Sequence, residues 1–510
     1  MHATTLTIRA DAPIGTISPR LYGHFAEHLG RCCYEGLWVG PGERAIPHQD
    51  GFRADVLDAL RALPVPLLRW PGGCYADHYH WRDGIGPAEQ RPIRLGMSCG
   101  LQVEDDNSLG THEFLRLCTL LGAEPYLAGN VGSGTPQELC DWVEYCNSAV
   151  RTTLARERAA NGSRAPFGVK LWGVGNESWG CGGNYDAVSY AHEYRRYATM
   201  LRHVDENTEL VACGLEDPNL FASGHEADWN ARLLAALGKN IDLVDHLAIH
   251  YYWITGGPET EFSEEEYYRL LDEAEQTERL VQRTAATIQE ATATYQRPGK
   301  QHRIGIALDE WGVWHPEARP WGPRGQVACR APITYEQANT LRDALAAGVA
   351  LEGFHRQCGV LTLANLAQIV NVLQAVVMTE GPEMWLTPTY HVLRLHRPHL
   401  GATALPVDIT QGDSLPGGSP AVSATASRQD TGVAVTIINR HWDQPADVRI
   451  VGGSGQASAE ILTADRPSAV NSARDPSRVA PAALTVQRDG NAYRVELPPH
   501  ALATMVLRGR

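Results

Sequence analysis

Several features that define particular protein classes are missing from this chain of 510 residues. It has no run of about 18 apolar residues, which a membrane-spanning helix needs, and its first residues form no signal-peptide core. Basic residues form no run either, and the net charge of −15 at pH 7 disfavours binding to nucleic acid or to an anionic membrane. We therefore predict a cytoplasmic protein without a nucleic-acid or membrane partner.

Cysteine pairs with CxxC spacing are also absent, although the chain has 11 cysteines. Their odd number and irregular spacing, from Cys32 to Cys358, predict reduced thiols rather than a disulfide scaffold. Three sets of residues could still suggest a metal site: Cys32 with Cys33, Cys140 with Cys146, and His78 with His80. Zinc ligands usually occur in closer pairs, so we predict no metal and no cofactor.

Apolar runs of strand length alternate with helical patterns through most of the chain. The candidate strands are 21–27, 66–72, 125–131, 169–177, 210–215, 247–253, 304–310 and 360–368. Eight strands are the number that a closed parallel barrel requires, and the active site of such a barrel lies at the C-terminal ends of its strands. We predict a (β/α)8 TIM barrel over residues 16–384.

Helical segments between these strands are indicated by apolar residues that share one face. Val56, Leu57, Leu60 and Leu63 form one such face, and Phe114, Leu117, Cys118 and Leu121 form another. Two capping-box patterns, Ser263 with Glu266 and Thr334 with Gln337, predict the starts of further helices.

The pattern changes near residue 385, after which no cysteine occurs. Short alternating runs, such as 433–438 and 493–497, are separated by turns rich in Gly, Ser and Pro. This pattern predicts a C-terminal antiparallel β-sandwich of jelly-roll-like form over residues 385–510. The opening strand Thr5–Ile8 comes too early for the barrel, so we expect residues 1–15 to join the sandwich.

Two predicted strands end on glutamates, Glu177 and Glu310, and Asn176 directly precedes the first. Two carboxylates at the ends of barrel strands suit the cleavage of a glycosidic bond, because one carboxyl protonates the leaving oxygen while the other meets the oxocarbenium-like centre. Strand-terminal acids in structural ion pairs are the alternative interpretation.

Further segments occur in a fixed order around these glutamates: 21–30, 68–74, 81–87, 142–147 and 365–372. Together with the glutamate segments they resemble the α-L-arabinofuranosidases of glycoside hydrolase family 51. The resemblance extends from about residue 16 to the end of the chain, with the C-terminal part covered only by its general pattern.

The resemblance implies that Glu177 is the general acid/base and Glu310 the nucleophile. It also implies sugar contacts or supporting contacts for Glu27, Arg69, His250, Tyr252 and Gln368, with Arg69 and Tyr252 placed against the nucleophile. Asn176 can donate a hydrogen bond to the sugar 2-hydroxyl, an interaction that strengthens in the transition state. Trp179 could form a wall on the leaving-group side.

Two positions depart from the family pattern. Cys74 occupies a position where better-known members carry Asn, and because a thiol is a weak donor we expect a weak or missing hydroxyl contact there. The loop 179–184 also differs from the family sequence. We expect both departures to affect subsite preference and to leave the chemistry intact.

These observations predict a retaining, exo-acting α-L-arabinofuranosidase that releases terminal arabinofuranose from arabinoxylan or arabinan oligosaccharides. The resemblance also implies a homo-oligomer, commonly a hexamer. Alternatives are the same mechanism on a β-xyloside, a galactofuranoside or a β-glucan, a metal-dependent hydrolase that uses His24, His28 and His250, and a sugar-binding protein without activity.

Overall fold

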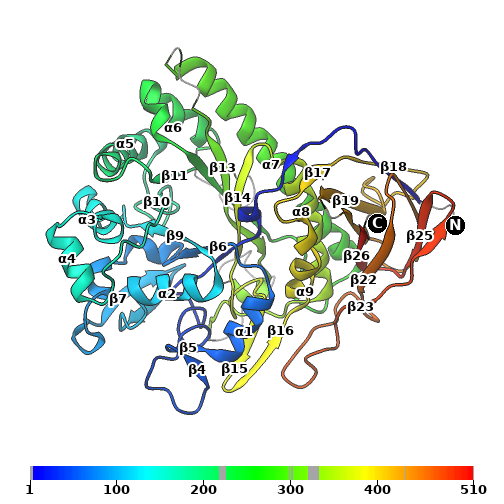
Figure 1. Cartoon of the computed structure of the whole chain (residues 1–510), viewed down its shortest axis with the longest axis horizontal. Coiled ribbons are helices and arrows are strands. Elements are labelled where there is room, and N and C mark those ends of the chain that lie inside the picture. Colours follow the sequence, from blue (N-terminus) through cyan, green and yellow to red (C-terminus); the bar gives the residue numbers. More distant parts are fainter. Residues whose placement is uncertain are drawn as a thin grey trace.

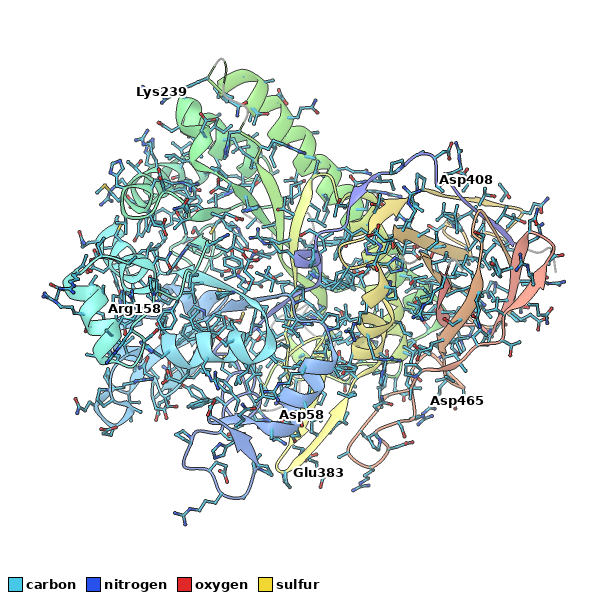
Figure 2. All side chains as sticks on the ribbon, viewed as in Figure 1. Asp58, Arg158, Lys239, Glu383, Asp408 and Asp465 are labelled. Carbon is cyan, nitrogen blue, oxygen red and sulfur yellow. A yellow bond between two sulfur atoms is a disulfide. The ribbon has the colours of Figure 1, made fainter. Side chains whose placement is uncertain are left out.

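The computed structural model describes residues 4–216, 226–297, 299, 302–319, 332–430 and 432–508. The chain forms a barrel surrounded by helices and, beside it, a unit made of β-sheets (Figure 1). Figure 2 shows side chains throughout both parts, with Lys239 on the barrel and Asp408 and Asp465 on the sheet unit. None of the described helices has the length and apolar character that crossing a membrane would require.

Eight parallel strands close the barrel in the order β10-β11-β12-β13-β14-β3-β6-β9. Their bounds are β3 Gly23–Phe25, β6 Leu67–Trp70, β9 Glu124–Gly129, β10 Leu171–Val174, β11 Glu209–Cys213, β12 His246–Trp253, β13 Gly305–Val313 and β14 Leu361–Ala367. Every predicted strand segment contains or overlaps one of them, so the predicted fold class is confirmed. Their C-terminal ends meet at one end of the barrel, where the site is built.

The described helices lie outside the barrel strands and pack against the barrel, against one another or against the C-terminal sheets. They are α1 Ala54–Ala62, α2 Thr111–Leu121, α3 Pro136–Asn147, α4 Thr153–Ala160, α5 Ala187–Val204, α6 Trp229–Leu237, α7 Glu264–Tyr295, α8 Leu341–Arg356 and α9 Pro388–Leu395. Val56, Leu57 and Leu60 of α1 are buried, as their spacing predicts. The Ser263 cap of α7 is also confirmed, since its hydroxyl accepts from the N–H of Glu266.

The predicted cap at Thr334 is wrong. The helix α8 begins later, at Leu341, and Thr340 caps it in a capping box with Asp343. The segment before it is not helical, and Gln337 bonds instead to the backbone at Val313 and His315. A local pattern of Thr and Gln was therefore overridden by hydrogen bonds to a distant strand.

The C-terminal part contains two sheets packed face to face. One has the order β18-β1-β21-β25-β24 and the other β2-β17-β19-β20-β26-β22-β23. The bounds are β1 Thr4–Ile8, β2 Gly15–Thr16, β17 Thr403–Leu405, β18 Val407–Thr410, β19 Val422–Gln429, β20 Gly432–Asn439, β21 Ala446–Val451, β22 Gln456–Leu462, β23 Ala482–Ala483, β24 Gln487–Asp489, β25 Ala492–Leu497 and β26 Ala501–Arg508. The early strand β1 lies between β18 and β21. The exact domain limits, 1–15, 16–384 and 385–510, stay a prediction.

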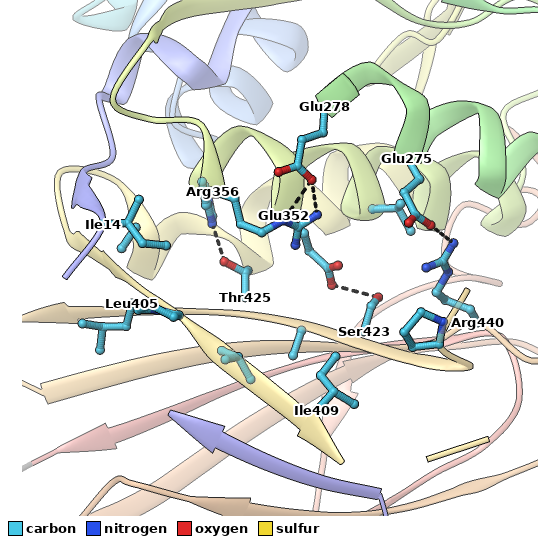
Figure 3. Close-up of a pocket in the computed structure, with 17 residues that line it drawn as sticks. Ile14, Glu275, Glu278, Glu352, Arg356, Leu405, Ile409, Ser423, Thr425 and Arg440 are labelled. Carbon is cyan, nitrogen blue, oxygen red and sulfur yellow. Dashed lines mark hydrogen bonds and ion pairs between the residues drawn. The ribbon is translucent and has the colours of Figure 1, made fainter. Parts of the chain in front are cut away.

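The helices α7 and α8 face the sandwich across a cavity of about 390 Å³ (Figure 3). Ion pairs and a hydrogen bond cross or line it: Arg440 pairs with Glu275 at 2.8 Å, and the Ser423 hydroxyl donates to Glu352 at 3.0 Å. Burial raises the pKa of Glu352 to about 7. Charged groups therefore line the contact between barrel and sandwich.

Three small hairpins lie outside the barrel and the two sandwich sheets. They are β4 His48–Gln49 with β5 Phe52–Arg53, β7 Arg94–Ser98 with β8 Leu101–Asp105, and β15 Val377–Glu380 with β16 Glu383–Leu386. The tip of the β7–β8 hairpin, Cys99 and Gly100, reaches the pocket at the C-terminal end of the barrel. There the hydroxyl of Tyr335 donates to the carbonyl of Cys99. This bond ties the hairpin to the segment before α8.

Candidate active site

The residues predicted from the sequence gather at the C-terminal end of the barrel. A pocket of about 360 Å³ is lined by seven of them: Glu27, Cys74, Glu177, Trp179, Tyr252, Glu310 and Gln368. The other three, Arg69, Asn176 and His250, line a small cavity deeper in the barrel, which Glu177 also touches. All ten predicted site residues therefore lie at one site, in and directly beneath one pocket.

Glu310 points into the pocket because β13 is irregular. Opposite β12, Ile249 pairs with Leu308 and His250 pairs with Glu310, so Asp309 is an extra residue in the strand. Successive side chains of a regular strand alternate between faces, but a bulge changes this alternation. As a result Asp309 and Glu310 both turn inward, and Asp309 accepts a hydrogen bond from Tyr126 at 2.6 Å.

Glu310 is buried and held from two sides. Arg69 donates to its Oε1 at 2.8 Å, and the Tyr252 hydroxyl donates to its Oε2 at 2.7 Å. Burial alone would raise the pKa of Glu310, but the charges of His250 and Arg69 and both hydrogen bonds lower it below the ordinary value. Glu310 is therefore a fixed and ionised carboxylate.

Glu177 lies on a tight turn after β10. Gly175 has φ +83° and Glu177 has φ +40°, a left-handed conformation that non-glycine residues rarely adopt and that often marks functional sites. Its Oε1 is 2.9 Å from Nδ1 of His250. The turn thus places a partly buried carboxyl at the wall of the pocket, with one histidine partner.

His250 links the two glutamates. Its Nδ1 is 2.9 Å from Glu177 and 3.7 Å from Glu310. Burial lowers the pKa of His250, but the charge of Glu310 and the contact with Glu177 outweigh this and raise the pKa overall. One carboxylate oxygen of each glutamate and a His250 nitrogen all lie within 4.8 Å of one another.

Arg69 fixes the orientation of Asn176. Its Nη2 donates to Oδ1 of Asn176 at 2.6 Å, while the backbone N–H of Asn176 donates to the buried Asp77 at 3.2 Å. Because Oδ1 is engaged by the guanidinium, the side-chain NH₂ of Asn176 is the group left to reach a bound sugar.

Glu27 and Gln368 form a second polar pair in the pocket. Gln368 donates to Glu27 at 3.0 Å, and Ser98 donates to the same carboxylate at 2.6 Å. Burial raises the pKa of Glu27 to about 7, and the charge of Glu310 adds to this shift. The backbone at residue 73 can lie this close to the Glu27 carboxylate only because residue 73 is glycine, since a Cβ there would lie 2.3 Å from Glu27.

The prediction of reduced thiols is wrong for Cys74. It forms a disulfide with Cys181, 107 positions later in the chain. The bridged sulfurs have no S–H group, so the weak thiol contact predicted for Cys74 cannot form. Eight other described cysteines are free, and Cys329 lies outside the described residues. The spacing of the two residues carries no signal for this pairing.

Trp179 lines the pocket and is almost fully buried, and its indole N–H donates to the carbonyl of Gly214 at 3.2 Å.

Three further residues of the site were not predicted from the sequence. Trp314 lines the pocket and packs edge-on against Tyr252. Ser98 binds Glu27, and Asp77 accepts hydrogen bonds from the loops after β9 and β10. Asp77 could have been suspected from its place just beyond the second strand.

The three histidines of the metal-dependent alternative do not converge. In the described part of the chain, two groups of residues are spaced to hold a metal ion, Glu177 with His250 and Glu310, and Cys74 with Glu177 and Cys181. Neither group includes His24 or His28. His28 accepts from the indole N–H of Trp70 and lies among aromatic rings. Burial lowers the pKa of His24 to about 3, as expected for a histidine within the barrel core.

Comparison with known families gives two matches along the chain. Residues 59–269 match the α-L-arabinofuranosidase 1 domain, and residues 309–501 match the α-L-arabinofuranosidase C-terminal domain. The two matched regions contain both Glu177 and Glu310. They lie on either side of α7, most of which falls between them.

Similar proteins cover the whole chain. An intracellular exo-α-L-arabinofuranosidase of Bacteroides ovatus is 41% identical over 99% of this chain and 96% of its own length. The crystal structure of the family 51 arabinofuranosidase of Xanthomonas axonopodis pv. citri is 35% identical, covers 100% of both chains and has a TM-score of 0.88. An arabinose complex of the Thermotoga maritima enzyme is 28% identical over 100% of both chains, with a TM-score of 0.85. The chain therefore belongs to glycoside hydrolase family 51 and is an α-L-arabinofuranosidase.

Proposed function

We propose that the protein is a retaining, exo-acting enzyme that removes terminal non-reducing α-L-arabinofuranosyl residues by double displacement. The observation that carries this proposal is the separation of Glu177 and Glu310. Carboxylate oxygens of the two residues lie within 4.8 Å of each other. Retaining glycosidases hold their carboxyl groups about 5–5.5 Å apart, whereas inverting enzymes need about 6.5–9.5 Å to admit a water molecule.

The environments of the two residues support their separate roles. Glu310 is the nucleophile, because Arg69 and Tyr252 keep it ionised and aimed into the pocket. Glu177 is the acid/base, because it lies on the pocket wall beside His250. In the first step Glu310 attacks the anomeric carbon while Glu177 protonates the leaving oxygen. In the second step Glu177 removes a proton from water, which attacks the anomeric carbon, so the bond to Glu310 breaks and its carboxylate is released.

The remaining polar residues suit a small sugar in this pocket. Asn176 has its NH₂ available for the 2-hydroxyl, because Arg69 holds its carbonyl oxygen. Glu27 and Gln368 present a linked acceptor and donor to the other hydroxyls. Trp179 and Trp314 supply apolar walls. Such a pocket suits the end of a chain, which supports exo action on arabinoxylan or arabinan oligosaccharides.

The alternative specificities are tested with a panel of nitrophenyl glycosides. The proposal expects the α-L-arabinofuranoside to give the highest kcat/KM, above the β-xyloside, the galactofuranoside and β-glucan substrates. NMR of the first product formed should show the α anomer, as in the substrate. Release of the β anomer would contradict the retaining mechanism, and a preference for another glycoside would contradict the specificity.

We also propose a cytoplasmic location and a homo-oligomer, a hexamer by family resemblance. The similar Bacteroides ovatus protein is called intracellular, which supports the location. An exposed apolar stripe on the β7 hairpin, formed by Ile93, Leu95 and Met97, supports self-association, since monomers seldom expose such patches. Light scattering after gel filtration measures the number of subunits, and a monomer would contradict this part of the proposal.

A further inference from the structure

The disulfide beside Glu177 places three potential metal ligands close together. The sulfurs of Cys74 and Cys181 lie 3.9 and 3.6 Å from Oε2 of Glu177. Cys74 is buried in the pocket wall, whereas Cys181 is exposed at its edge. The bond can therefore be reached by a small reductant from solvent. Six of the free cysteines in the described residues, by contrast, are buried.

We propose that the reduced form of Cys74 and Cys181 is a binding site for a thiophilic divalent cation, Zn²⁺ or Cd²⁺, with Glu177 as the third ligand. Reduction by a dithiol transfers two electrons and two protons to the sulfurs, and the dithiol becomes a disulfide. Binding of the cation then releases both thiol protons to solvent, because the thiolate is the form that binds metal.

The spacing suits tetrahedral zinc. With Zn–S near 2.3 Å and Zn–O near 2.0 Å, a tetrahedral site separates sulfur and oxygen by about 3.5 Å. The observed separations of 3.6 and 3.9 Å are close to this value. Once the disulfide is cleaved, the sulfurs are free to separate by side-chain rotation. Glu177 therefore needs little movement to complete the site.

Neighbouring groups favour the bound state. The NH₂ of Asn176 lies 3.8 Å from the sulfur of Cys181 and can donate to the thiolate, and such partners of ligand atoms strengthen metal sites. His250 holds the other oxygen of Glu177 at 2.9 Å, which leaves Oε2 for the cation. The fourth position faces the pocket, where water can occupy it.

The site would regulate the proposed function, on which this consequence rests. A cation on Oε2 of Glu177 removes the acid/base from the reaction, so the reduced enzyme is inhibited by Zn²⁺ and the disulfide form is not. In a reducing compartment, where disulfides seldom persist, the dithiol form would be the one exposed to the cation.

The test compares the disulfide enzyme with enzyme reduced by dithiothreitol, which is removed under argon because it binds cadmium itself. Titration with Cd²⁺ should give an ultraviolet thiolate-to-cadmium charge-transfer band in the reduced enzyme only. This band should stop growing at one equivalent of Cd²⁺ per chain. Zn²⁺ should inhibit only the reduced enzyme, and EDTA should restore its activity. The absorption band reports the site even if the proposed glycosidase activity fails, so the two failures are distinguishable.

Variants locate the ligands. Cys181→Ser should weaken Cd²⁺ binding at least about 100-fold, since even loss of a group that only supports a ligand costs 10–100-fold, and Cys74→Ser should do the same. Cys358→Ser, just before β14 at the opposite end of the barrel, should bind Cd²⁺ like the reduced parent. Glu177→Gln should keep the band and bind more weakly. Equal binding by disulfide and reduced enzyme, or unchanged binding by both Cys181→Ser and Cys74→Ser, would overturn the proposal.

Discussion

Two buried glutamates in different regions of the molecule have opposite pKa shifts. Glu310 in the pocket and Glu352 at the barrel–sandwich contact are both almost fully buried. The charges of His250 and Arg69 lower the pKa of Glu310 despite its burial. Glu352 receives one hydrogen bond from Ser423, and burial raises its pKa to about 7. Two arginines near Glu352 also lower its pKa, but none of the described ion pairs includes Glu352, so burial dominates there. Cations in direct contact with the carboxylate, rather than burial, therefore separate a reactive carboxylate from a structural one.

The largest expected effect comes from removing the reactive member of this comparison. Glu310→Ala should lower kcat for every arabinofuranoside by at least about 10⁴-fold, because no glycosyl-enzyme can form. Glu352→Gln is the matched control and should keep most of the activity, since Glu352 lies outside the pocket. Comparable losses in both variants would show that the two regions do not differ as described.

A smaller effect is expected when one partner of Glu310 is removed. Tyr252→Phe deletes the donor to Oε2, so the pKa of Glu310 should rise toward its ordinary value. Activity requires ionised Glu310 and falls as the pH decreases through its pKa. The acid limb of kcat/KM should therefore move to higher pH, with a loss of about tenfold that is greatest on the acid side. An unchanged acid limb with a uniform loss would mean that Tyr252 acts only through packing.

The smallest expected effect concerns stability. Because the pKa of Glu352 is raised in the folded state, folding binds a proton, and stability falls as the pH rises through the range from about 4.5 to 7. Glu352→Gln removes the buried charge and keeps an acceptor for Ser423. At pH 8 it should raise the free energy of unfolding by on the order of 1 kcal/mol. At pH 4 the variant and the parent should be similar.

The exposed Glu383 of β16 provides a control for this measurement. Glu383→Gln should change stability by less than about 0.5 kcal/mol at either pH. Thermal unfolding followed by circular dichroism at pH 4 and pH 8 compares the three proteins. A destabilising effect of Glu352→Gln at pH 8 would contradict this prediction, because it would mean that ionised Glu352 stabilises the contact between barrel and sandwich.

The barrel could be predicted because each of its strands is an apolar run that can be recognised in the sequence itself. The C-terminal ends of parallel strands, such as Leu247–Trp253 and Ile304–Glu310, lie at the same end of a barrel. The polar residues at these strand ends were therefore expected to lie close together. The site residues followed from the strand ends and from the family motifs. The bulge at Asp309 was not predicted, because it depends on the register between β12 and β13.

Two other features could not be predicted from the sequence. The disulfide joins Cys74 and Cys181, which are far apart in the chain and meet only because the loops after β6 and β10 converge at the pocket. The Thr334 pattern was locally correct for a cap, yet Gln337 is engaged by the backbone of another segment. In both cases contacts between distant segments decided the outcome.

The most direct test of the account is the chemistry of Glu177→Ala. This variant lacks the proton donor but keeps the nucleophile, so it should still react with dinitrophenyl arabinofuranoside, whose leaving group needs no proton, and lose activity on oligosaccharides. The glycosyl-enzyme should then accumulate for want of a base. Added azide should restore turnover and give an arabinosyl azide with the anomeric configuration of the substrate. Equal loss on both substrates, with no effect of azide, would contradict the assignment of Glu177 as the acid/base.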